Sequence, residues 1–354
     1  MKAGWRVLVA AVLVAVSSTS VGAHALVPGP PVGFTASLVV GGLHDGIGGL
    51  PTAFAYAPDG RIFVARKTGV VDVYDGGVQH VFWDLRDQVN TIQSRGLLGL
   101  ALDPAFASNH RVYLMFTQEL DPANPDQAGP AGGEIVRVAQ QAAKPDVVDP
   151  ASRVTLLTGY QSISREHTVG ALRFDAAGNL LASFGDAADL GVNDGSALAT
   201  LDLNDLRGKV IRIDPGTGLG VAGNPYFDAG NPGAVRSKVF ARGFRNPYRF
   251  SIDPDNGTVY VGDVGWNTWE MLNAFPATFG DADRDRNAGW PCYEGGNGVA
   301  LPQPDFEFAP TTQAACQAIY SPDQGGTGPG VSAPLYAYRH DDPGGENGSA
   351  ITAG

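Results

Sequence analysis

Few residues of this chain carry a charge, and only one short run near the N-terminus is strongly apolar. Charged residues make up 17% of the 354, with 36 acidic against 24 basic side chains and a formal net charge of −12. So acidic a protein repels phosphate, which excludes a general nucleic-acid binder. No later segment has the roughly 20 apolar residues of a membrane helix, which excludes a membrane span. The hydrophobic fraction of 44% still supports a sizeable core and excludes global disorder.

Motifs of several common enzyme classes are absent or incomplete. The sequence has no G-x-S-x-G nucleophile motif and no pair of histidines at metal-ligand spacing. A G-x-G-x-x-G match occurs at Gly218, Gly220 and Gly223, but Asn224-Pro225 follows at once, so no helix can open there. Without a helix N-terminus to hold a pyrophosphate, the match does not indicate a nicotinamide site.

The N-terminus has the organisation of a secretory signal. Two cations precede an apolar run over residues 7–16, and small residues then lead to Ala23-His24-Ala25. The run is too short to span a bilayer, which needs about 20 apolar residues. We therefore predict a signal peptide over residues 1–25, and a mature chain over residues 26–354 that is secreted or periplasmic.

Only two cysteines are present, Cys292 and Cys316. Neither has a second cysteine or a histidine at ligand spacing, so zinc binding is disfavoured. In the oxidising compartment that an exported protein enters, the two cysteines predict a disulfide. Closing a loop of about 25 residues would contribute roughly 3–3.5 kcal/mol of stability in the chain-entropy treatment.

One pattern recurs four times: alternating apolar residues, a turn rich in Pro, Asp and Gly, and a second short apolar strand. Each copy predicts a β-hairpin. The turns lie at Pro58, Pro104, Ala176 and Pro254, with spacings of 46, 72 and 78 residues. Such spacing is typical of four-stranded propeller blades with long insertions and not of a solenoid of fixed period. Helical patterns are faint, and only residues 196–206 are expected to form a short helix.

The predicted fold is therefore an all-β propeller. A fifth unit is expected to start near Leu335-Tyr-Ala-Tyr, and the chain stops at residues 349–354 in what resembles the start of a strand. An unclosed blade exposes unpaired strand edges. We therefore expect residues 26–354 to form an incomplete propeller that lacks its last blade or more.

Charge is distributed unevenly along the chain. Residues 236–249 hold five cations and no acid, whereas residues 250–294 hold eight acids against two arginines. The basic segment suggests an anionic ligand and the acidic one a hard cation such as calcium, the alternative being that both are solvated loop faces. Residues 281–287 imitate the start of a calcium loop, but Arg286 and Cys292 stand where such a loop has its glycine and its last acid. A polar surface loop is favoured there.

One histidine has the surroundings of a loop mouth. His167 lies in Arg165-Glu-His-Thr, which precedes a glycine and a strand-like run. Asp186 follows the next predicted strand and so returns to the same mouth. A lone histidine is more often structural, but a histidine with a carboxylate nearby is a candidate acid–base pair.

Seven short motifs occur in order along the chain. They are Arg95-Gly-Leu-Leu-Gly-Leu-Ala, Glu166-His-Thr-Val-Gly, Gly185-Asp, Leu206-Arg-Gly-Lys-Val-Ile-Arg-Ile-Asp, Gly243-Phe-Arg-Asn-Pro, Gly262-Asp-Val-Gly-Trp-Asn-Thr-Trp-Glu and Ala288-Gly-Trp-Pro. Together they resemble the glucose/sorbosone dehydrogenase family, six-bladed propellers related to soluble sugar dehydrogenases that use pyrroloquinoline quinone (PQQ). The resemblance spans roughly residues 33–354.

The resemblance implies roles for four side chains. His167 would be the base that takes the proton of a sugar hydroxyl while hydride goes to the quinone. Asp186 would hold the imidazole tautomer and stabilise the imidazolium. Arg245 and Asn246 would bind PQQ, which agrees with the position of Arg245 in the basic segment, since PQQ is a tricarboxylate.

The resemblance also implies a metal site and shows departures from the family. The backbone carbonyls of Gly265 and Trp266 would bind calcium, which would polarise the quinone carbonyl. Ser94 and Gly191 stand where the family's sugar dehydrogenases have glutamines, Ser94 beside the cofactor, and Trp266 replaces the usual Gln or Pro.

The leading hypothesis is an exported dehydrogenase, dependent on PQQ and calcium, that oxidises the anomeric or another hydroxyl of a sugar and passes electrons to an acceptor. The first alternative is a non-catalytic extracellular propeller that binds a carbohydrate or a protein. The second is a calcium-dependent lactonase-type propeller, which would need carboxylates converging on one metal ion.

Overall fold

The computed structural model of the chain describes residues 32–41, 43, 49–189, 195–278, 286–298, 301–302, 314–320, 322, 328–340 and 350–352. The predicted signal peptide, Gly191, residues 281–285 of the acidic stretch and residues 349, 353 and 354 of the last stretch lie outside these residues. In the part of the chain that is described, no helix is long and apolar enough to cross a membrane.

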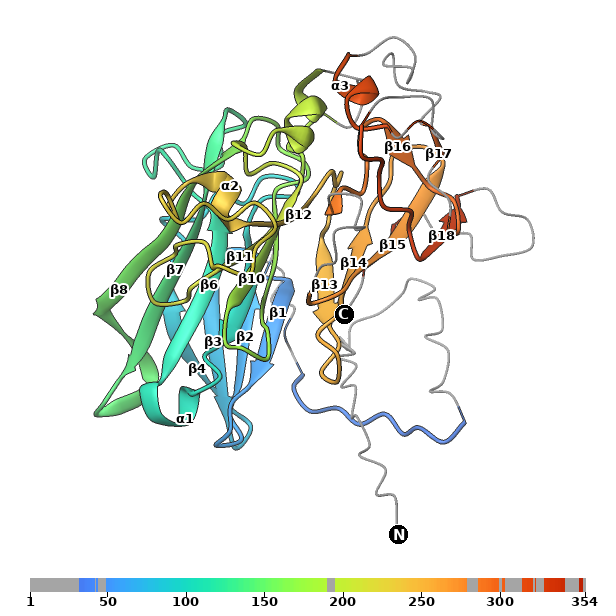
Figure 1. The fold of residues 1–354 in the computed structure, drawn as a ribbon. Helices are drawn as coiled ribbons and strands as arrows, with labels where there is room; N and C mark the ends of the chain where they lie inside the picture. The colour runs from blue at the N-terminus through green and yellow to red at the C-terminus, as the bar shows by residue number, and fades with distance from the viewer. Residues whose placement is uncertain are drawn as a thin grey trace, which may run out of the picture.

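Four antiparallel sheets of four strands each follow one another along the chain, which confirms the all-β propeller arrangement (Figure 1). The first is β1 (Pro51–Tyr56), β2 (Ile62–Arg66), β3 (Val70–Asp75) and β4 (Val78–Asp84). The second is β5 (Leu97–Leu102), β6 (Arg111–Thr117), β7 (Ala131–Gln141) and β8 (Lys144–Ser162). The third is β9 (Val169–Phe174), β10 (Leu180–Phe184), β11 (Lys209–Ile213) and β12 (Val239–Arg242). The fourth is β13 (Arg249–Ile252), β14 (Val259–Asp263), β15 (Trp269–Phe275) and β18 (Tyr336–Arg339).

The remaining elements are short and lie between the strands. They are α1 (Phe106–Asn109), the 3-10 helix η1 (Gly195–Leu201), α2 (Val235–Lys238), the strand pair β16 (Tyr293–Glu294) and β17 (Leu301–Pro302), and α3 (Ala314–Gln317). The expected helix at 196–206 is thus a 3-10 turn over its first half. The carboxylates of Asp202 and Asp205 then accept from the amides of Asn204 and Arg207 and form turns of their own.

The four predicted hairpins are the first two strands of the four sheets. In the first hairpin, Asp59 and Gly60 form the turn between β1 and β2, and Gly60 has φ +94°, a left-handed conformation that glycine adopts without strain. Turn chemistry therefore located the start of each blade.

The prediction that a fifth unit starts near Leu335 is wrong. Residues Tyr336–Arg339 form β18, which pairs with β15 as the outer strand of the fourth sheet, with Trp269 opposite Arg339. A short alternating run looks alike whether it opens a blade or closes one. A long insertion separates β18 from β15 in the sequence, so the closing strand lies far along the chain from the strand with which it pairs.

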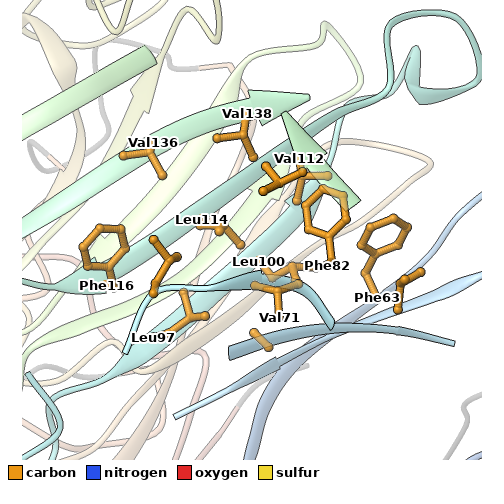
Figure 2. Packing of buried hydrophobic residues seen from close by; sticks show 14 of the residues in the cluster. Phe63, Val71, Phe82, Leu97, Leu100, Val112, Leu114, Phe116, Val136 and Val138 are labelled. Atoms are coloured by element: carbon orange, nitrogen blue, oxygen red, sulfur yellow. The ribbon is translucent and has the colours of Figure 1, made fainter. Parts of the chain in front are cut away.

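The core lies between neighbouring sheets. Figure 2 shows the cluster between the first and second sheets, where Phe63, Phe82, Leu100 and Leu114 are all buried. Similar clusters join the second sheet to the third and the third to the fourth. Apolar side chains are buried on both faces of the inner sheets. Each Å² of apolar surface removed from water in this way stabilises the packing of the blades by about 25 cal/mol.

The first strands of the four sheets face one another around a common axis. Consecutive residues of β1, β5 and β9, together with Arg249 of β13, line a cavity of about 640 Å³. At one end of this cavity, Nη2 of Arg249 donates to the carbonyl of Thr52 at 2.7 Å. Loops that precede β5, β9 and β13 therefore meet at the same end of the propeller.

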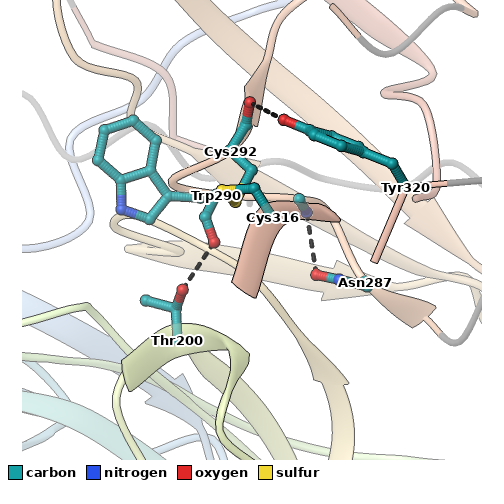
Figure 3. Close-up of a disulfide and its surroundings, with 7 residues drawn as sticks. Thr200, Asn287, Trp290, Cys292, Cys316 and Tyr320 are labelled. Atoms are coloured by element: carbon teal, nitrogen blue, oxygen red, sulfur yellow. Dashed lines mark hydrogen bonds between the residues drawn. A yellow bond between two sulfur atoms is a disulfide. The ribbon is translucent and has the colours of Figure 1, made fainter. Parts of the chain in front are cut away.

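The predicted disulfide between Cys292 and Cys316 is present, with a Cα–Cα distance of 5.6 Å (Figure 3). Both cysteines are fully buried, and the carbonyl of Cys292 accepts a hydrogen bond from the hydroxyl of Tyr320 at 2.9 Å. The disulfide joins α3 to the segment that precedes β16.

We predict that replacing both cysteines with serine lowers the free energy of unfolding by about 3 kcal/mol, because the unfolded chain gains the freedom of the opened loop. Urea unfolding without reductant measures the difference. Wild-type protein in reductant is the control and should match the double variant. A loss below about 1 kcal/mol would show that packing around Tyr320 compensates for the disulfide.

Candidate functional site

His167 and Asp186 meet at the end of the propeller where the first strands begin. His167 lies two residues before β9 and Asp186 two residues after β10, and because β9 and β10 are antiparallel, both residues reach the same edge of the third sheet. Nδ1 of His167 lies 2.8 Å from Oδ1 of Asp186, and both side chains are buried. The structure therefore brings together the two residues that the sequence singled out.

The backbone around this pair has an unusual local geometry. His167 has φ +47° and Ala187 has φ +54°, both in the left-handed region. The amide of Ala187 donates to the carbonyl of His167 at 3.1 Å, and the hydroxyl of Tyr160 donates to the same carbonyl at 2.8 Å. A Cβ on Gly185 would lie 2.2 Å from that carbonyl, so only glycine fits there. Left-handed backbone outside glycine is costly and concentrates at functional sites.

Asp186 is ionised in this environment. Burial raises the pKa of its carboxyl, but the neighbouring His167, the Arg245 guanidinium and the amide of Ala188 outweigh burial, and the pKa lies below its usual value. Oδ1 accepts from the Ala188 amide at 2.9 Å, and Oδ2 accepts from Nε1 of Trp290 at 2.8 Å. An ionised carboxylate accepts only, so the ring proton of His167 sits on Nδ1.

The second ring nitrogen of His167 is available as a base. With the proton on Nδ1, Nε2 carries a lone pair, and it makes no hydrogen bond with any of the residues that the structure describes. This arrangement can accept a proton at Nε2 while Asp186 stabilises the resulting imidazolium.

Arg245 and Asn246 lie in the loop before β13. Arg245 is 4% exposed, and its carbonyl accepts from the amide of Asp186 at 2.8 Å, which joins the two loops. Oδ1 of Asp263 accepts from the amide of Asn246 at 2.7 Å, and Oδ2 accepts from that of Arg245 at 3.2 Å. Burial raises the pKa of Asp263 to about 8 although both amides lower it.

The Arg245 guanidinium points at backbone carbonyls. Nη1 donates to Gly265 at 2.6 Å and to Val264 at 3.2 Å, and the guanidinium carbon lies 5.7 Å from the ring centroid of Trp290. Both hydrogen bonds that this side chain makes with the described residues use Nη1. Nε and Nη2 are therefore available as donors to an anion. The side-chain amide of Asn246 likewise has no protein partner among these residues.

Gly265 and Trp266, the predicted calcium ligands, follow β14. Their amides donate to Glu270 at 3.3 Å and to Glu294 at 2.6 Å. The carbonyl of Gly265 is bonded to a cationic guanidinium, so it does not fit a calcium ion in this conformation. The described part of the chain holds no cluster of three or more His, Cys, Asp or Glu side chains that could bind a metal ion.

Ser94 lies near the same end, three residues before β5. Its hydroxyl donates to the carboxylate of Glu166, and its carbonyl accepts from the hydroxyl of Thr168 at 2.9 Å, so it contacts both neighbours of His167. Beside them is a cavity of about 570 Å³ whose lining includes Glu166, Arg165 and Ala187. This cavity is the candidate substrate pocket.

The basic and acidic segments are not wholly solvated loop faces. Lys238, Arg242 and Arg245 are all at least nine-tenths buried, as are Asp263 and Glu270, whereas Arg236 and Asp255 are exposed. Burial of charged groups around Arg245 is typical of a functional site.

Sequence reasoning missed Trp290, which contacts both Asp186 and Arg245. The residue was visible within a motif, Ala288-Gly-Trp-Pro, but its contact with Asp186 spans 104 positions. No periodicity or spacing rule reaches that far along a chain.

Comparison with known proteins shows the family to which the chain is similar. Residues 49–321 match the family described as Glucose / Sorbosone dehydrogenase. The HIPL1 protein of Arabidopsis thaliana is 26% identical over 290 residues, covering 69% of this chain and 40% of its own. The human Hedgehog-interacting protein is 28% identical over 245 residues, covering 62% and 32%.

A solved structure shows the same fold. The PQQ-bound aldose sugar dehydrogenase of Streptomyces coelicolor has a TM-score of 0.57 and 24% identity, covering 82% of this chain and 68% of its own. The chain spans between 30% and 60% of the length of these curated relatives.

Proposed function

The chain belongs to the glucose/sorbosone dehydrogenase family, and from this premise we propose that it oxidises a hydroxyl group of a sugar, with PQQ as the hydride acceptor. The observation that carries the proposal is the buried His167–Asp186 pair, in which Nε2 of His167 has no hydrogen-bond partner among the described residues and the adjacent residue, Glu166, lines the cavity of about 570 Å³. A dehydrogenase needs a base at this point because the hydroxyl must lose a proton as its carbon loses hydride.

His167 and Asp186 divide the proton chemistry. Nε2 of His167 accepts the hydroxyl proton, and Asp186 stabilises the imidazolium through Nδ1. The sugar carbon becomes a carbonyl, and the two electrons leave with the hydride. When bound, PQQ supplies the two-electron acceptor for that hydride. An external acceptor then reoxidises the enzyme, so turnover requires a second, electron-accepting partner.

The residues at the site fit an anionic, planar cofactor. Nε and Nη2 of Arg245 and the side-chain amide of Asn246 are donors without a described protein partner, and the Trp290 ring lies beside the guanidinium. Guanidinium groups bind carboxylates through paired hydrogen bonds. The carbonyl of Gly265 does not fit calcium while Arg245 occupies it, so calcium at Gly265 and Trp266 stays a prediction of the resemblance, and no step depends on it.

The test is a titration of the protein with PQQ, with calcium or with a chelator, followed by dye reduction with a panel of aldoses. We expect saturable binding and reduction that depends on the sugar. Arg245→Gln should weaken PQQ binding about 10-fold to 100-fold, because a hydrogen bond to a charged group contributes about 1.5–3 kcal/mol. Arg86→Gln changes an exposed arginine and should bind PQQ normally. Equal binding by both variants, or reduction without any sugar, would contradict the proposal.

The second candidate is a non-catalytic propeller that binds a carbohydrate or a protein at the same end. It is supported by the similarity to the Hedgehog-interacting protein and by the bond between Arg245 and Gly265, which satisfies the site without a metal ion. Absence of PQQ binding together with binding of an immobilised glycan or protein would favour it. A calcium-dependent lactonase would instead hydrolyse lactones with no quinone present.

The protein is proposed to act outside the cytoplasm. The buried disulfide and the N-terminal signal pattern both support export, since disulfides persist in oxidising compartments. Fractionation of cells that express the full chain would test this, with cytoplasmic retention as the contrary result.

A further inference from the structure

Trp290 contacts the site from a distant part of the chain. Its side chain is 3% exposed, and Nε1 donates to Oδ2 of Asp186 at 2.8 Å. Its ring lies beside the guanidinium of Arg245, and the ring of Trp266 packs edge-on against it at a centroid distance of 6.5 Å. One indole thus contacts both the proposed acid–base pair and the proposed cofactor-binding arginine.

The backbone of Trp290 is held from several sides. Its carbonyl accepts from the hydroxyl of Thr200 at 2.7 Å (Figure 3), and its amide donates to Gly243 at 2.9 Å. Thr200 belongs to η1, which is itself fixed because Nζ of the buried Lys209 donates to the Thr200 carbonyl at 2.7 Å. Two residues beyond Trp290, Cys292 is tied to α3 by the disulfide. The indole therefore starts from a fixed position.

Asp186 depends on this indole for one of its two oxygens. Oδ1 accepts from His167 and from the amide of Ala188, whereas the indole is the donor that the described residues supply to Oδ2. Asp186 is fully buried. A buried carboxylate oxygen that loses its donor is strongly disfavoured, so the carboxylate would rotate or take up a proton. Either change would weaken the hydrogen bond that holds the ring proton of His167 on Nδ1.

We infer that Trp290 is a positioning residue for the His167–Asp186 pair: its indole N–H fixes the Asp186 carboxylate so that His167 keeps its proton on Nδ1 and its lone pair on Nε2. The catalytic consequence rests on the proposed function, whereas the positioning itself is a property of the protein alone. Because the same ring contacts Arg245, a substitution of Trp290 changes the surroundings of both the His167–Asp186 pair and Arg245.

The test is NMR of the protein with nitrogen-labelled histidine, comparing wild type with Trp290→Phe, which keeps an aromatic ring but removes the N–H. In the wild type we expect His167 in the Nδ1–H form, with a ring proton protected from exchange with water. In Trp290→Phe we expect the Nε2–H form to become populated and the protected proton to be lost. Trp83→Phe makes the same chemical change in β4, away from the site, and should leave the His167 signals unchanged.

Activity gives a second readout. If the proposed function holds, Trp290→Phe should lower kcat about 10-fold to 100-fold and change KM for the sugar by less than about threefold, because the indole acts through the base and not on the substrate. If no sugar is oxidised by the wild type, the proposed function fails, and the NMR comparison still decides the positioning role. Unchanged His167 signals in Trp290→Phe, or the same change in Trp83→Phe, would overturn the inference.

Discussion

Replacing His167 with asparagine is expected to lower kcat for sugar oxidation by about 10³-fold, within the range for loss of a general acid–base group. The expectation follows from Nε2, a base that no described residue occupies, next to a fully buried carboxylate. Asparagine is the appropriate replacement because residue 167 has φ +47°, a conformation that asparagine tolerates better than most residues. The variant should therefore fold and lose only the base.

Two measurements separate loss of the base from loss of the site. PQQ binding by His167→Asn should stay within about threefold of wild type, since Arg245 and Asn246 are untouched. His80→Asn changes an exposed histidine of β4 and should leave kcat unaltered. A kcat for His167→Asn above about a tenth of the wild-type value would remove His167 from the mechanism.

Replacing Asp186 with asparagine should also reduce kcat, by about 10³-fold to 10⁴-fold, but for a different reason than the loss of His167. An amide can donate to Nδ1, which moves the imidazole proton to Nε2 and removes the lone pair that the reaction needs. The amide also presents only one oxygen to the two donors on either side of it, Trp290 and the Ala188 amide, so some stability is lost as well.

The stability of Asp186→Asn should depend on pH in a defined direction. The pKa of Asp186 is lowered in the folded protein, so its carboxylate stabilises the fold at neutral pH, and this contribution is lost as pH falls from the unfolded value of 3.8 through the lower folded value. The deficit of the variant relative to wild type should therefore be largest near pH 7 and shrink in acid. Urea unfolding between pH 3 and pH 7 measures it, with Asp87→Asn, an exposed aspartate, as the control. A deficit that grows in acid would contradict the assignment.

Local sequence patterns were sufficient to predict the propeller, whereas contacts between segments far apart in the sequence could not be predicted. The Pro/Asp/Gly turns located the first hairpin of every blade, and the antiparallel order of β9 and β10 then implied that His167 and Asp186 meet. Both signals act over fewer than about 25 residues. The contacts of Trp290 with Asp186 and of β15 with β18 join distant segments, and no pattern along the sequence encodes them.

Side-chain direction was a second limit. The family resemblance implied a metal ion at the carbonyl of Gly265 and a cofactor at Arg245, but it does not reveal that the Arg245 guanidinium donates a hydrogen bond to that carbonyl. The acidic and basic segments were open to two interpretations because burial is a property of the fold. Burial of Arg245, Asp263 and Glu270 argues against wholly solvated loop faces, and the anionic ligand and the cation stay predictions.

The position of β18 has a consequence for how the chain folds as it is made. Because Tyr336–Arg339 closes the fourth sheet, that sheet cannot be completed until residue 339 has left the ribosome or the export channel, whereas each earlier sheet consists of consecutive strands. Closing so long a loop slows folding, since its entropy is lost before the pairing compensates. The disulfide lies wholly within residues 276–335 and shortens the free part of this loop before β18 arrives. Formation of the disulfide would thus shorten the time for which the edge of β15 stays unpaired, and with it lower the tendency of the nascent protein to aggregate.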